Sequence, residues 1–500
     1  MKAVLLAILT TLTTLALILG VGVFFARWVA RKLEASAGHS PQYTLWEILF
    51  TLRARHLASI LLTVQRAERS KLAEHPMGSA PSVDWFQVIG IDPATFKPPP
   101  RPEHSPVDLT TVLGAGHPRS ISLSMPVIVA PMGYGVALNA ETKVALAQAS
   151  SLAGIAISTG EGLYLPEERS YAQRWILQQS RGFWAHDPRI LALADVIEVQ
   201  WGQGSEGATG LTKPKSELPR RFIDAVGGPA VIHAAPEGHL DAWIRELKIE
   251  RADCPIAVKL PASQHLESDL AYLLTLPIEI ITLDGSGAGS AGSAAVISDH
   301  FGITTALAIH RAHTWLVARG MRSQITLVAS GGIRGAADIA RLIGLGADAA
   351  AIGSSLLFAA LHDQIGQHLP TPPTALAFAH SRANSGHTLD VSQAANHATN
   401  WLEATRAELA GILRVAGVRT LSEFRQQRPL IARTKEAARV FQLPFDGGHS
   451  KDTSLEHKLH ALIASYSEMN DILADIEARL SIQSLRSSRG RSLRKSPRPG

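Results

Sequence analysis

The pattern of hydrophobic positions predicts short buried strands that alternate with amphipathic helices through the middle of the chain. The clearest example is residues 325–355, ITLVASGGIRGAADIARLIGLGADAAAIGSS. An apolar run at Ile325–Ala329 has the length of a buried strand, and Ala336–Leu345 has apolar residues at helical spacing. A second apolar run, Ala349–Ile352, follows. The segment therefore predicts a strand–helix–strand unit of the kind that builds parallel sheets.

Similar apolar runs recur along the chain, with helices or long loops between them. We interpret eight as strands: Val127–Ala130, Gly154–Ser158, Gly182–Ala185, Val196–Gln200, Ile256–Leu260, Ile280–Asp284, Ile325–Ser330 and Ala349–Gly353. Polar or glycine-rich residues cluster at their carboxyl ends. This pattern predicts an α/β fold, a (β/α)8 TIM barrel, with its functional site on the carboxyl-terminal face.

Other segments flank the predicted barrel. A helix is expected at Tyr43–Lys71, and a helix at Ala394–Ala416 is expected to pack on the barrel. Leu455–Leu480 also has helical spacing and is expected to dock or to self-associate. The predicted organisation is a transmembrane anchor (1–32), a helical and proline-rich amino-terminal arm (33–106), the barrel with its packed helix (107–427), a carboxyl-terminal helical extension (428–480) and a basic disordered tail (481–500).

The amino-terminal apolar run predicts a membrane anchor. Ala3–Phe25 carries no charge and is long enough to cross a bilayer, which takes about 20 residues. A signal peptide cleaved near Ala35–Ala37 is the alternative, but this run exceeds the usual length of such a peptide's apolar region. The basic residues that follow the run predict a single-pass protein with the barrel in the cytoplasm.

Composition narrows the function classes. Hydrophobic residues make up 46% of the chain and charged residues 18%, which suits one large core and excludes a disordered chain. The formal net charge is a modest +5, and no nucleic-acid partner is expected. Cys254 is the single cysteine, so the chain can form neither an internal disulfide nor a site with several thiolate ligands. We expect Cys254 to be a small buried hydrophobe.

Two turns of small residues indicate a phosphate site. Ser330-Gly331-Gly332 follows the seventh predicted strand, and Gly353-Ser354-Ser355 follows the eighth. Loops at these two places bind phosphate in many barrels, because their backbone N–H groups can approach an anion. The alternative is a tight turn and a helix end without a ligand. Two such turns, one strand–helix unit apart, favour phosphate.

A phosphate at this place, with glycine-rich turns after other strands, suits FMN, and at this point the sequence resembles a known family. Over about Val107–Gln427 it is similar to the FMN domain of glutamate synthase, some of whose relatives are membrane-anchored single-domain proteins. The motifs follow in the family's order: PVIVAPMGYGVALNAETKVALAQAS, ISTGEG, VIEVQWGQG, AVKL, ITLDGSGAGSAGSAAVISDHFGI, the unit described first and AANHATNWLEATRAELAGILRVAGVRTLSEF. In that family the reduced flavin delivers hydride from N5 to the imine of 2-oxoglutarate, which gives glutamate.

The resemblance implies roles for particular residues. Glu161 would face the reacting end of the substrate, Gln203 the flavin ring and Lys259 the N1–C2=O region of the flavin. The residues implied to bind FMN are Pro131, Met132, Gly133, Lys259, Asp284, Gly285, Gly287, Gly331, Gly332, Arg334, Gly353 and Ser354. Three alternatives stay open. Lys259 could reach solvent, Glu161 could cap the next helix, and Asp284 could be a turn residue.

The chain departs from the family where an iron–sulfur cluster binds. His362, His368 and Pro373 stand at the places of the three cysteines, so no such cluster is expected. No other metal site is expected, and the two histidines are interpreted as surface residues.

The chain also departs in the substrate stretch. Gln200, Glu206 and Thr212 replace two lysines and a glutamine of the family, and Glu206 would repel a dicarboxylate. Lys213 and Lys215 lie close enough in sequence to repair part of this loss. No glutamine-hydrolysing domain is expected.

These features predict a membrane-anchored FMN-dependent oxidoreductase of the glutamate synthase type, acting on CH–NH2 donors. Its substrates would be a 2-oxo acid, reductively aminated to an amino acid, or the reverse, and its electron donor is unknown. The alternative is a non-catalytic FMN-barrel scaffold. A barrel of the inosine-monophosphate dehydrogenase type is disfavoured, because its cysteine nucleophile has no counterpart in Gly285–Ser293.

Overall fold

The computed structural model divides the chain into two compact units, residues 1–74 and 75–500. All described residues belong to the second unit. They are residue 78 and residues 83–446, except 97, 181–185, 205, 208, 210, 214, 216–217, 227–229, 234–238, 290–292 and 368–388. The expected helices at Tyr43–Lys71 and Leu455–Leu480 and the tail from residue 481 lie outside them. So do His368, expected on the surface, and Pro373, which stands at the place of the third family cysteine.

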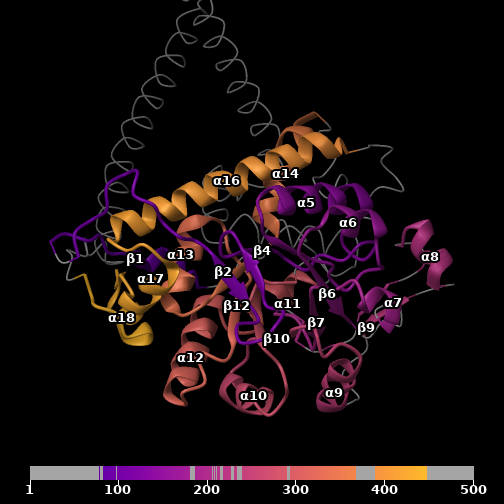
Figure 1. Ribbon diagram of the computed structural model, residues 1–500, viewed down its shortest axis with the longest axis horizontal. Coiled ribbons are helices and arrows are strands. Elements are labelled where there is room, and N and C mark those ends of the chain that lie inside the picture. Colours follow the sequence, from indigo (N-terminus) through magenta and orange to yellow (C-terminus); the bar gives the residue numbers. More distant parts are fainter. Residues whose placement is uncertain are drawn as a thin grey trace, which may run out of the picture. The chain divides into compact units, whose positions relative to one another are not determined.

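Eight parallel strands close into a barrel at the centre of this unit (Figure 1). The last strand pairs with the first, with Ala350 opposite Val127, so the sheet has no free edge. The strands are, in order around the barrel, β4 (Val127–Val129), β5 (Ala156–Ser158), β6 (Trp175–Gln179), β7 (Val196–Gln200), β10 (Ile256–Pro261), β11 (Ile280–Asp284), β12 (Thr326–Ser330) and β13 (Ala349–Ile352). The predicted TIM barrel is confirmed.

The third strand was predicted in the wrong place. It is β6, whereas the prediction put it at Gly182–Ala185, a segment outside the described residues. The polar carboxyl end of β6 explains the error, because the sequence pattern of Gln178 and Gln179 is typical of a loop. Both are buried: Gln178 Nε2 donates to Glu198 Oε1 at 2.9 Å, and Trp243 Nε1 donates to Gln179 Oε1 at 2.7 Å.

Helices surround the barrel (Figure 1). They are α5 (Ala140–Leu152), α6 (Pro166–Tyr171), α7 (Pro188–Leu191), α8 (Arg220–Val226), α9 (Leu240–Glu250), α10 (Leu266–Leu273), α11 (Ala295–His300), α12 (Thr305–Ala318), α13 (Ala336–Leu345) and α14 (Ser354–Gln367). Helix α13 has the predicted bounds. It ends at Gly346, whose φ of 120° is accessible to glycine but strained for other residues.

Segments before and after the barrel pack together on its outside. Helix α16 (Val391–Val415) runs along α5 and α14, and it buries the predicted face of Leu402, Leu409 and Leu413. The helix predicted at Ala394–Ala416 is thus confirmed. Part of the expected amino-terminal arm joins the same unit, because β1 (Ile89–Ile91) pairs with β14 (Leu430–Ala432). Three short helices complete this region: α4 (Trp85–Val88), α17 (Leu421–Gln427) and α18 (Lys435–Phe441).

The barrel interior changes from apolar to polar along its axis. Val196 and Ile280, the first residues of their strands, and Val328 in the middle of β12 form an apolar cluster with the leucines of the hairpin β2 (Thr111–Leu113) and β3 (Ile121–Leu123). The N–H of Gly114 donates to Thr326 Oγ1 at the start of β12, so this hairpin closes the amino-terminal end of the barrel. Several buried residues near the carboxyl ends are polar, among them Gln200, Lys259 and Asp284. The polar groups that could contact a ligand therefore gather at the carboxyl-terminal face. A two-stranded sheet of β8 (Leu211–Lys213) and β9 (Ala230–His233) lies outside the barrel.

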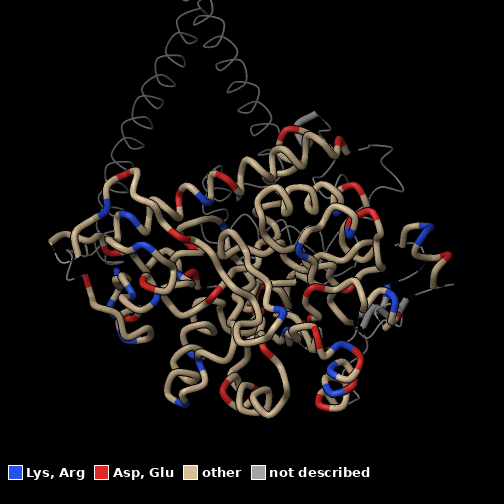
Figure 2. Tube along the Cα trace, viewed as in Figure 1, with Lys and Arg blue, Asp and Glu red and all other residues tan. Residues whose placement is uncertain are grey.

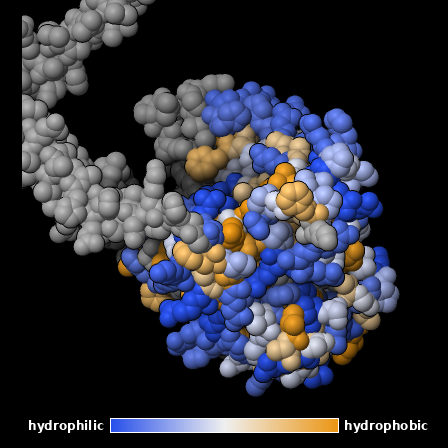
Figure 3. Space-filling model, turned by 90° about the vertical axis from the view of Figure 1, so that its left-hand side faces the viewer, coloured by the Kyte–Doolittle hydropathy of each residue, from blue (hydrophilic) through white to orange (hydrophobic). Residues whose placement is uncertain are grey.

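Most charged residues lie on the outer helices and loops (Figure 2), and hydrophilic residues cover most of the face drawn in Figure 3. Buried charges are therefore exceptions that need partners. Cys254 is buried, and burial raises the pKa of its thiol to about 11, which leaves it protonated and unreactive at neutral pH.

The structure contradicts the expected localisation. In the part of the chain that it describes, no helix is long and apolar enough to cross a membrane. The prediction of a single-pass protein with its barrel in the cytoplasm is therefore not kept. The segment on which it rested, residues 3–25, lies outside the described residues.

Candidate active site at the mouth of the barrel

A cavity of about 680 Å³ opens at the carboxyl ends of the barrel strands. Of the residues predicted to form a site, all except Gly133 and Gly285 line it. The lining predicted residues are Pro131, Met132, Glu161, Gln203, Lys259, Asp284, Gly287, Gly331, Gly332, Arg334, Gly353 and Ser354. The fold thus brings together side chains from loops that are far apart in the sequence.

Gly133 supports the cavity from behind. A Cβ atom on Gly133 would lie 2.4 Å from the backbone nitrogen of Gly162, and one on Gly162 would lie 2.3 Å from Tyr134 N. The loops after β4 and β5 therefore touch backbone to backbone, which only glycine allows. This close approach places Glu161 in the cavity wall. Glu161 is 7% exposed and does not cap α6, whose N-cap is Leu165.

A buried ion pair lies on one side of the cavity. Lys259 Nζ is 2.9 Å from Asp284 Oδ2, and the two side chains are 3% and 0% exposed. Burial alone would lower the pKa of Lys259, but Asp284 and Glu198 raise the pKa above its ordinary value, so the amine is charged at neutral pH. Asp284 Oδ2 also accepts the N–H of Gly204, whereas its Oδ1 has no hydrogen-bond partner among the described residues.

A second carboxyl group lies deeper in the barrel, below this pair. Glu198 accepts hydrogen bonds from Gln178 Nε2 at 2.9 Å and from Thr282 Oγ1 at 2.7 Å. Burial raises the pKa of Glu198, and the nearby Lys259 opposes that rise. Lys259 therefore faces inward between two acidic side chains, and the alternative that it reaches solvent is wrong.

A second buried lysine–carboxyl pair supports the loop that carries Glu161. Lys143 of α5 lies 3.2 Å from Glu168 and donates to the carbonyl oxygens of Ser158 and Thr159 at 3.0 and 3.2 Å. Burial lowers the pKa of Lys143 and raises that of Glu168. Sequence analysis missed this pair, because a lysine on a helix reads as a solvent-facing residue.

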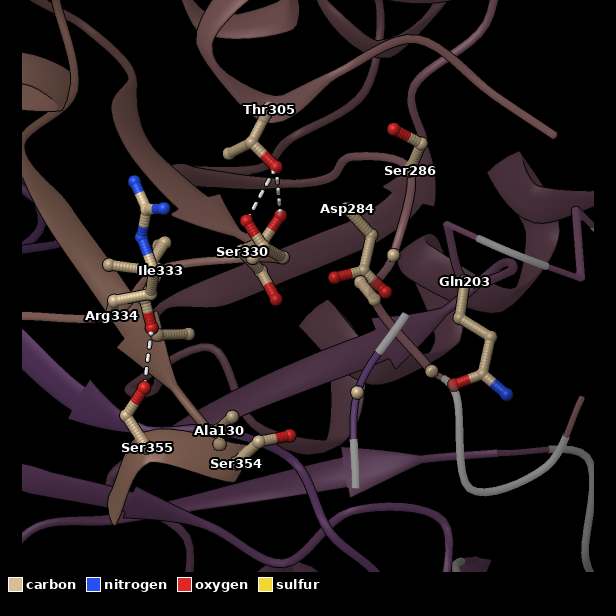
Figure 4. Close-up of a pocket in the computed structure, with 18 of the residues that line it drawn as sticks. Ala130, Gln203, Asp284, Ser286, Thr305, Ser330, Ile333, Arg334, Ser354 and Ser355 are labelled. Carbon is tan, nitrogen blue, oxygen red and sulfur yellow. Dashed lines mark hydrogen bonds between the residues drawn. The ribbon is translucent and has the colours of Figure 1, made fainter. Parts of the chain in front are cut away.

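Glycines and hydroxyl side chains form the adjoining part of the cavity wall, since Ser330 at the end of β12 is in register with Asp284 at the end of β11 (Figure 4). Gly331 and Gly332 have φ values of 109° and 68°, and nothing lies within 4 Å of where a Cβ on Gly332 would be. Thr305 fixes this turn, since its hydroxyl donates to the carbonyl oxygens of Ser330 at 3.0 Å and Gly331 at 2.8 Å. Ser355 Oγ donates to the carbonyl oxygen of Ile333 at 3.0 Å, which joins the two predicted phosphate turns.

Comparisons with known proteins identify the family. Residues 111–419 match the family model described as a conserved region in glutamate synthase. The chain belongs to the glutamate synthase family. It is 30% identical over 366 residues to a glutamate synthase large subunit-like protein of Rhizobium meliloti, covering 68% of this chain and 82% of that protein.

A more distant relative is the archaeal glutamate synthase [NADPH] of Methanocaldococcus jannaschii. It is 28% identical over 322 residues, and the match spans 62% of each chain. Among solved structures, a flavocytochrome b2 variant with sulfite bound has a TM-score of 0.47 at 16% identity, covering 80% of this chain and 90% of that one. That likeness is too distant to support any statement about function.

Arg334 is the predicted site residue whose placement differs most from its expected role. The resemblance to the glutamate synthase family implied that it binds the phosphate. Its guanidinium bonds Asp338 Oδ2 at 2.8 Å and Asp84 Oδ2 at 2.7 Å. In Figure 4 it extends away from Ser354 and Asp284. Two carboxylates thus neutralise the charge that a phosphate would need from Arg334.

Three residues of the substrate stretch of this family member are buried, and Gln200 lies beside the ion pair. Gln200 is paired with Lys259 in the register of β7 and β10, is 2% exposed, and neither its amide nitrogen nor its amide oxygen has a hydrogen-bond partner among the described residues. Gln203 is 4% exposed and packs against the turn that contains Gly289. Glu206 is also buried.

Several lining residues were not predicted. Asp84 and Phe86 come from the amino-terminal arm, which no local motif connects to the barrel. Thr304 and Thr305 begin α12, and two threonines before a helix are a capping signal rather than a ligand signal. Ser330 was predicted only as part of its turn.

Proposed function

We propose that this chain is an FMN-dependent oxidoreductase of the glutamate synthase type that reductively aminates a 2-oxo acid, or catalyses the reverse reaction. One observation carries the proposal: a single cavity has a buried lysine–carboxylate pair on one side and two glycine–serine turns on the other. Membership of the glutamate synthase family supports the same reaction class.

The residues present fit FMN. Gly331, Gly332, Gly353 and Ser354 offer an open, backbone-lined cradle for the phosphate. Asp284 Oδ1 is a buried acceptor without a partner among the described residues, and a ribityl hydroxyl would satisfy it. When bound, FMN supplies the two-electron redox chemistry that side chains lack.

Lys259 would supply positive charge where the reduced isoalloxazine ring is most negative. The raised pKa of Lys259 keeps it charged, and Asp284 and Glu198 hold its amine inside the barrel. Because the site is buried, this charge acts with little screening by water. Pro131 and Met132 would contact the apolar ring.

Glu161 and Gln203 would act on the substrate side. The carboxyl group of Glu161 lines the cavity, contributes to the raised pKa of Lys259, and opposes the burial that lowers the pKa of Lys143, so it lies within electrostatic range of each amine. A carboxylate there can hold an ammonium group or take up its proton. Gln203 offers an amide from the facing loop.

The buried amide of Gln200 favours a substrate less charged than 2-oxoglutarate. A desolvated dicarboxylate needs a cationic partner for each carboxylate, and here an uncharged amide stands next to Lys259 where the family has a lysine. The proposed substrate is therefore a 2-oxo acid with one carboxylate. Because the archaeal relative is named for NADPH, we propose NADPH as the first electron donor to test. No iron–sulfur cluster is part of the proposal, since Cys254 is the single cysteine.

Anaerobic reoxidation kinetics test this proposal. The purified full chain is reduced, then mixed in a stopped-flow instrument with ammonia and a panel of 2-oxo acids, and flavin absorbance is followed. We expect saturable reoxidation, faster with neutral-side-chain 2-oxo acids than with 2-oxoglutarate. Reoxidation by 2-oxoglutarate alone would reject the substrate assignment. Bound flavin that no 2-oxo acid reoxidises would instead favour the non-catalytic scaffold.

A further inference from the structure

A second cluster of potential ligands lies on the outside of the barrel, where α14 packs along α16 (Figure 1). His362 and Asp363 are consecutive residues of α14, and His397 belongs to α16. One donor atom from each of the three side chains lies within 4.8 Å of the other two. The cluster is about two helical turns beyond Ser354, so it is separate from the cavity.

His397 has a ring nitrogen that faces a carboxylate but makes no hydrogen bond to a described residue. Its Nδ1 atom is buried, has no hydrogen-bond partner among those residues, and lies 3.3 Å from Asp363 Oδ1. Leaving a buried polar atom unpaired costs free energy, and a missing ion is one common explanation.

His362 is oriented as a metal ligand. Its Nδ1 lies 2.9 Å from the carbonyl oxygen of Ala359 and must carry the proton to bond it. This tautomer leaves the lone pair on Nε2, which is how a backbone carbonyl prepares many metal-binding histidines. The ring centroids of His362 and His397 are 4.6 Å apart, so both rings face one small space.

We infer that His362, Asp363 and His397 bind one divalent transition-metal ion of the Zn²⁺ type between α14 and α16. Two imidazoles and a carboxylate are a ligand set that Zn²⁺ accepts, with water as the fourth ligand. With metal–ligand bonds of about 2.0–2.2 Å, the donor atoms of a tetrahedral site lie about 3.3–3.6 Å from one another. The donor atoms of the three side chains, now within 4.8 Å of one another, must therefore move together by about 1 Å. The exposed side chain of His362 can make that movement. The ion would fasten α14, whose first residues border the cavity, to α16.

Metal titration of the full chain tests this inference. The protein is stripped with EDTA, dialysed and titrated with Zn²⁺, and bound metal is measured by equilibrium dialysis. We expect one tight equivalent. His362→Ala and His397→Ala should each weaken binding at least about 100-fold, as expected for loss of a ligand rather than of its support. His104→Ala, which removes an exposed histidine of the amino-terminal arm, is the matched control and should bind like the parent chain.

Two outcomes would overturn the inference: no tight equivalent in the parent chain, or equal binding in all variants. Thermal unfolding separates a metal site from a simple Asp363–His397 ion pair. Zn²⁺ should raise the Tm of the parent chain and of His104→Ala, but not of His362→Ala or His397→Ala. A Tm that Zn²⁺ leaves unchanged would support the ion pair alone. If a variant fails to fold, the visible spectrum of Co²⁺ bound to the parent chain still decides, because absence of a tetrahedral nitrogen-ligated spectrum rejects the site.

Discussion

The two sides of the cavity are built in different ways. On one side, the turns after β12 and β13 present backbone and hydroxyl groups, and their only nearby guanidinium, in the described part of the chain, is neutralised by Asp84 and Asp338. On the other side, Lys259, Asp284 and Glu198 are buried groups that carry or can carry charge, and hydrogen bonds from Gln178, Thr282 and the N–H of Gly204 hold the two carboxyl groups in place. The first side suits a ligand's anion, and the second suits groups whose charge changes during a reaction.

This difference matters for stability as well as for chemistry. An uncharged turn tolerates substitution if its backbone geometry survives. A buried ion pair does not, because removing one partner leaves the other charged and desolvated. The charged side should therefore be sensitive in both folding and function, and the uncharged side mainly in ligand binding.

Replacing Lys259 should have the largest effect. Lys259→Met leaves Asp284 buried without its cation, which should lower the free energy of unfolding by about 3–5 kcal/mol. Urea denaturation followed by tryptophan fluorescence measures this. Lys248→Met is the control, because Lys248 pairs with Glu279 at 2.8 Å on the outer surface, partly exposed to water, and should cost about 1 kcal/mol or less. Equal losses in the two variants would remove the distinction between the two sides.

A negative charge introduced on the uncharged side should have the next largest effect. It should lower the affinity for FMN, with little effect on folding stability. A Cβ on Gly353 would lie 3.6 Å from Ala130 Cβ and 3.8 Å from Met132 Sδ, so a side chain fits there. Gly353→Asp should weaken FMN binding at least about tenfold relative to the isosteric Gly353→Asn, because only the aspartate repels the phosphate. Flavin fluorescence titration measures both affinities. Similar affinities would place the phosphate elsewhere.

Loss of one hydroxyl should have the smallest effect. Thr305→Val removes the donor to the carbonyl oxygens of Ser330 and Gly331 and should cost about 1 kcal/mol of folding stability. Thr304→Val is the control, because Thr304 Oγ1 is buried without a hydrogen-bond partner in the described part of the chain. Calorimetry of the two variants should show a lower Tm for Thr305→Val only. Equal losses of Tm in the two variants would show that the hydrogen bonds of Thr305 contribute nothing specific to the turn.

The same contrast explains what the sequence could predict. The uncharged side lies within one strand–helix–strand unit, so local periodicity and two glycine turns sufficed to place it. The charged side needs Glu198, Lys259 and Asp284 from three different strands, and only the register of the closed barrel brings Lys259 beside Asp284. Its supporting pair, Lys143 and Glu168, is visible only after α5 and α6 pack against the barrel.

The third strand shows a related limit. Gln178 and Gln179 are polar in sequence but buried in the barrel, so hydrophobicity alone put that strand too late in the chain. Inward-facing polar residues near the carboxyl ends of barrel strands indicate where the site lies. The same residues interrupt the run of hydrophobic residues by which a buried strand is predicted.

The central claim is that the cavity binds FMN with its phosphate on the uncharged side. Comparing FMN with riboflavin, which lacks only the phosphate, tests this most directly. Titration of flavin-free protein, followed by quenching of flavin fluorescence, should give one FMN per chain and an affinity for riboflavin at least about 100-fold weaker, a difference of about 2.7 kcal/mol. Equal affinities for the two flavins, or binding of neither, would contradict the claim.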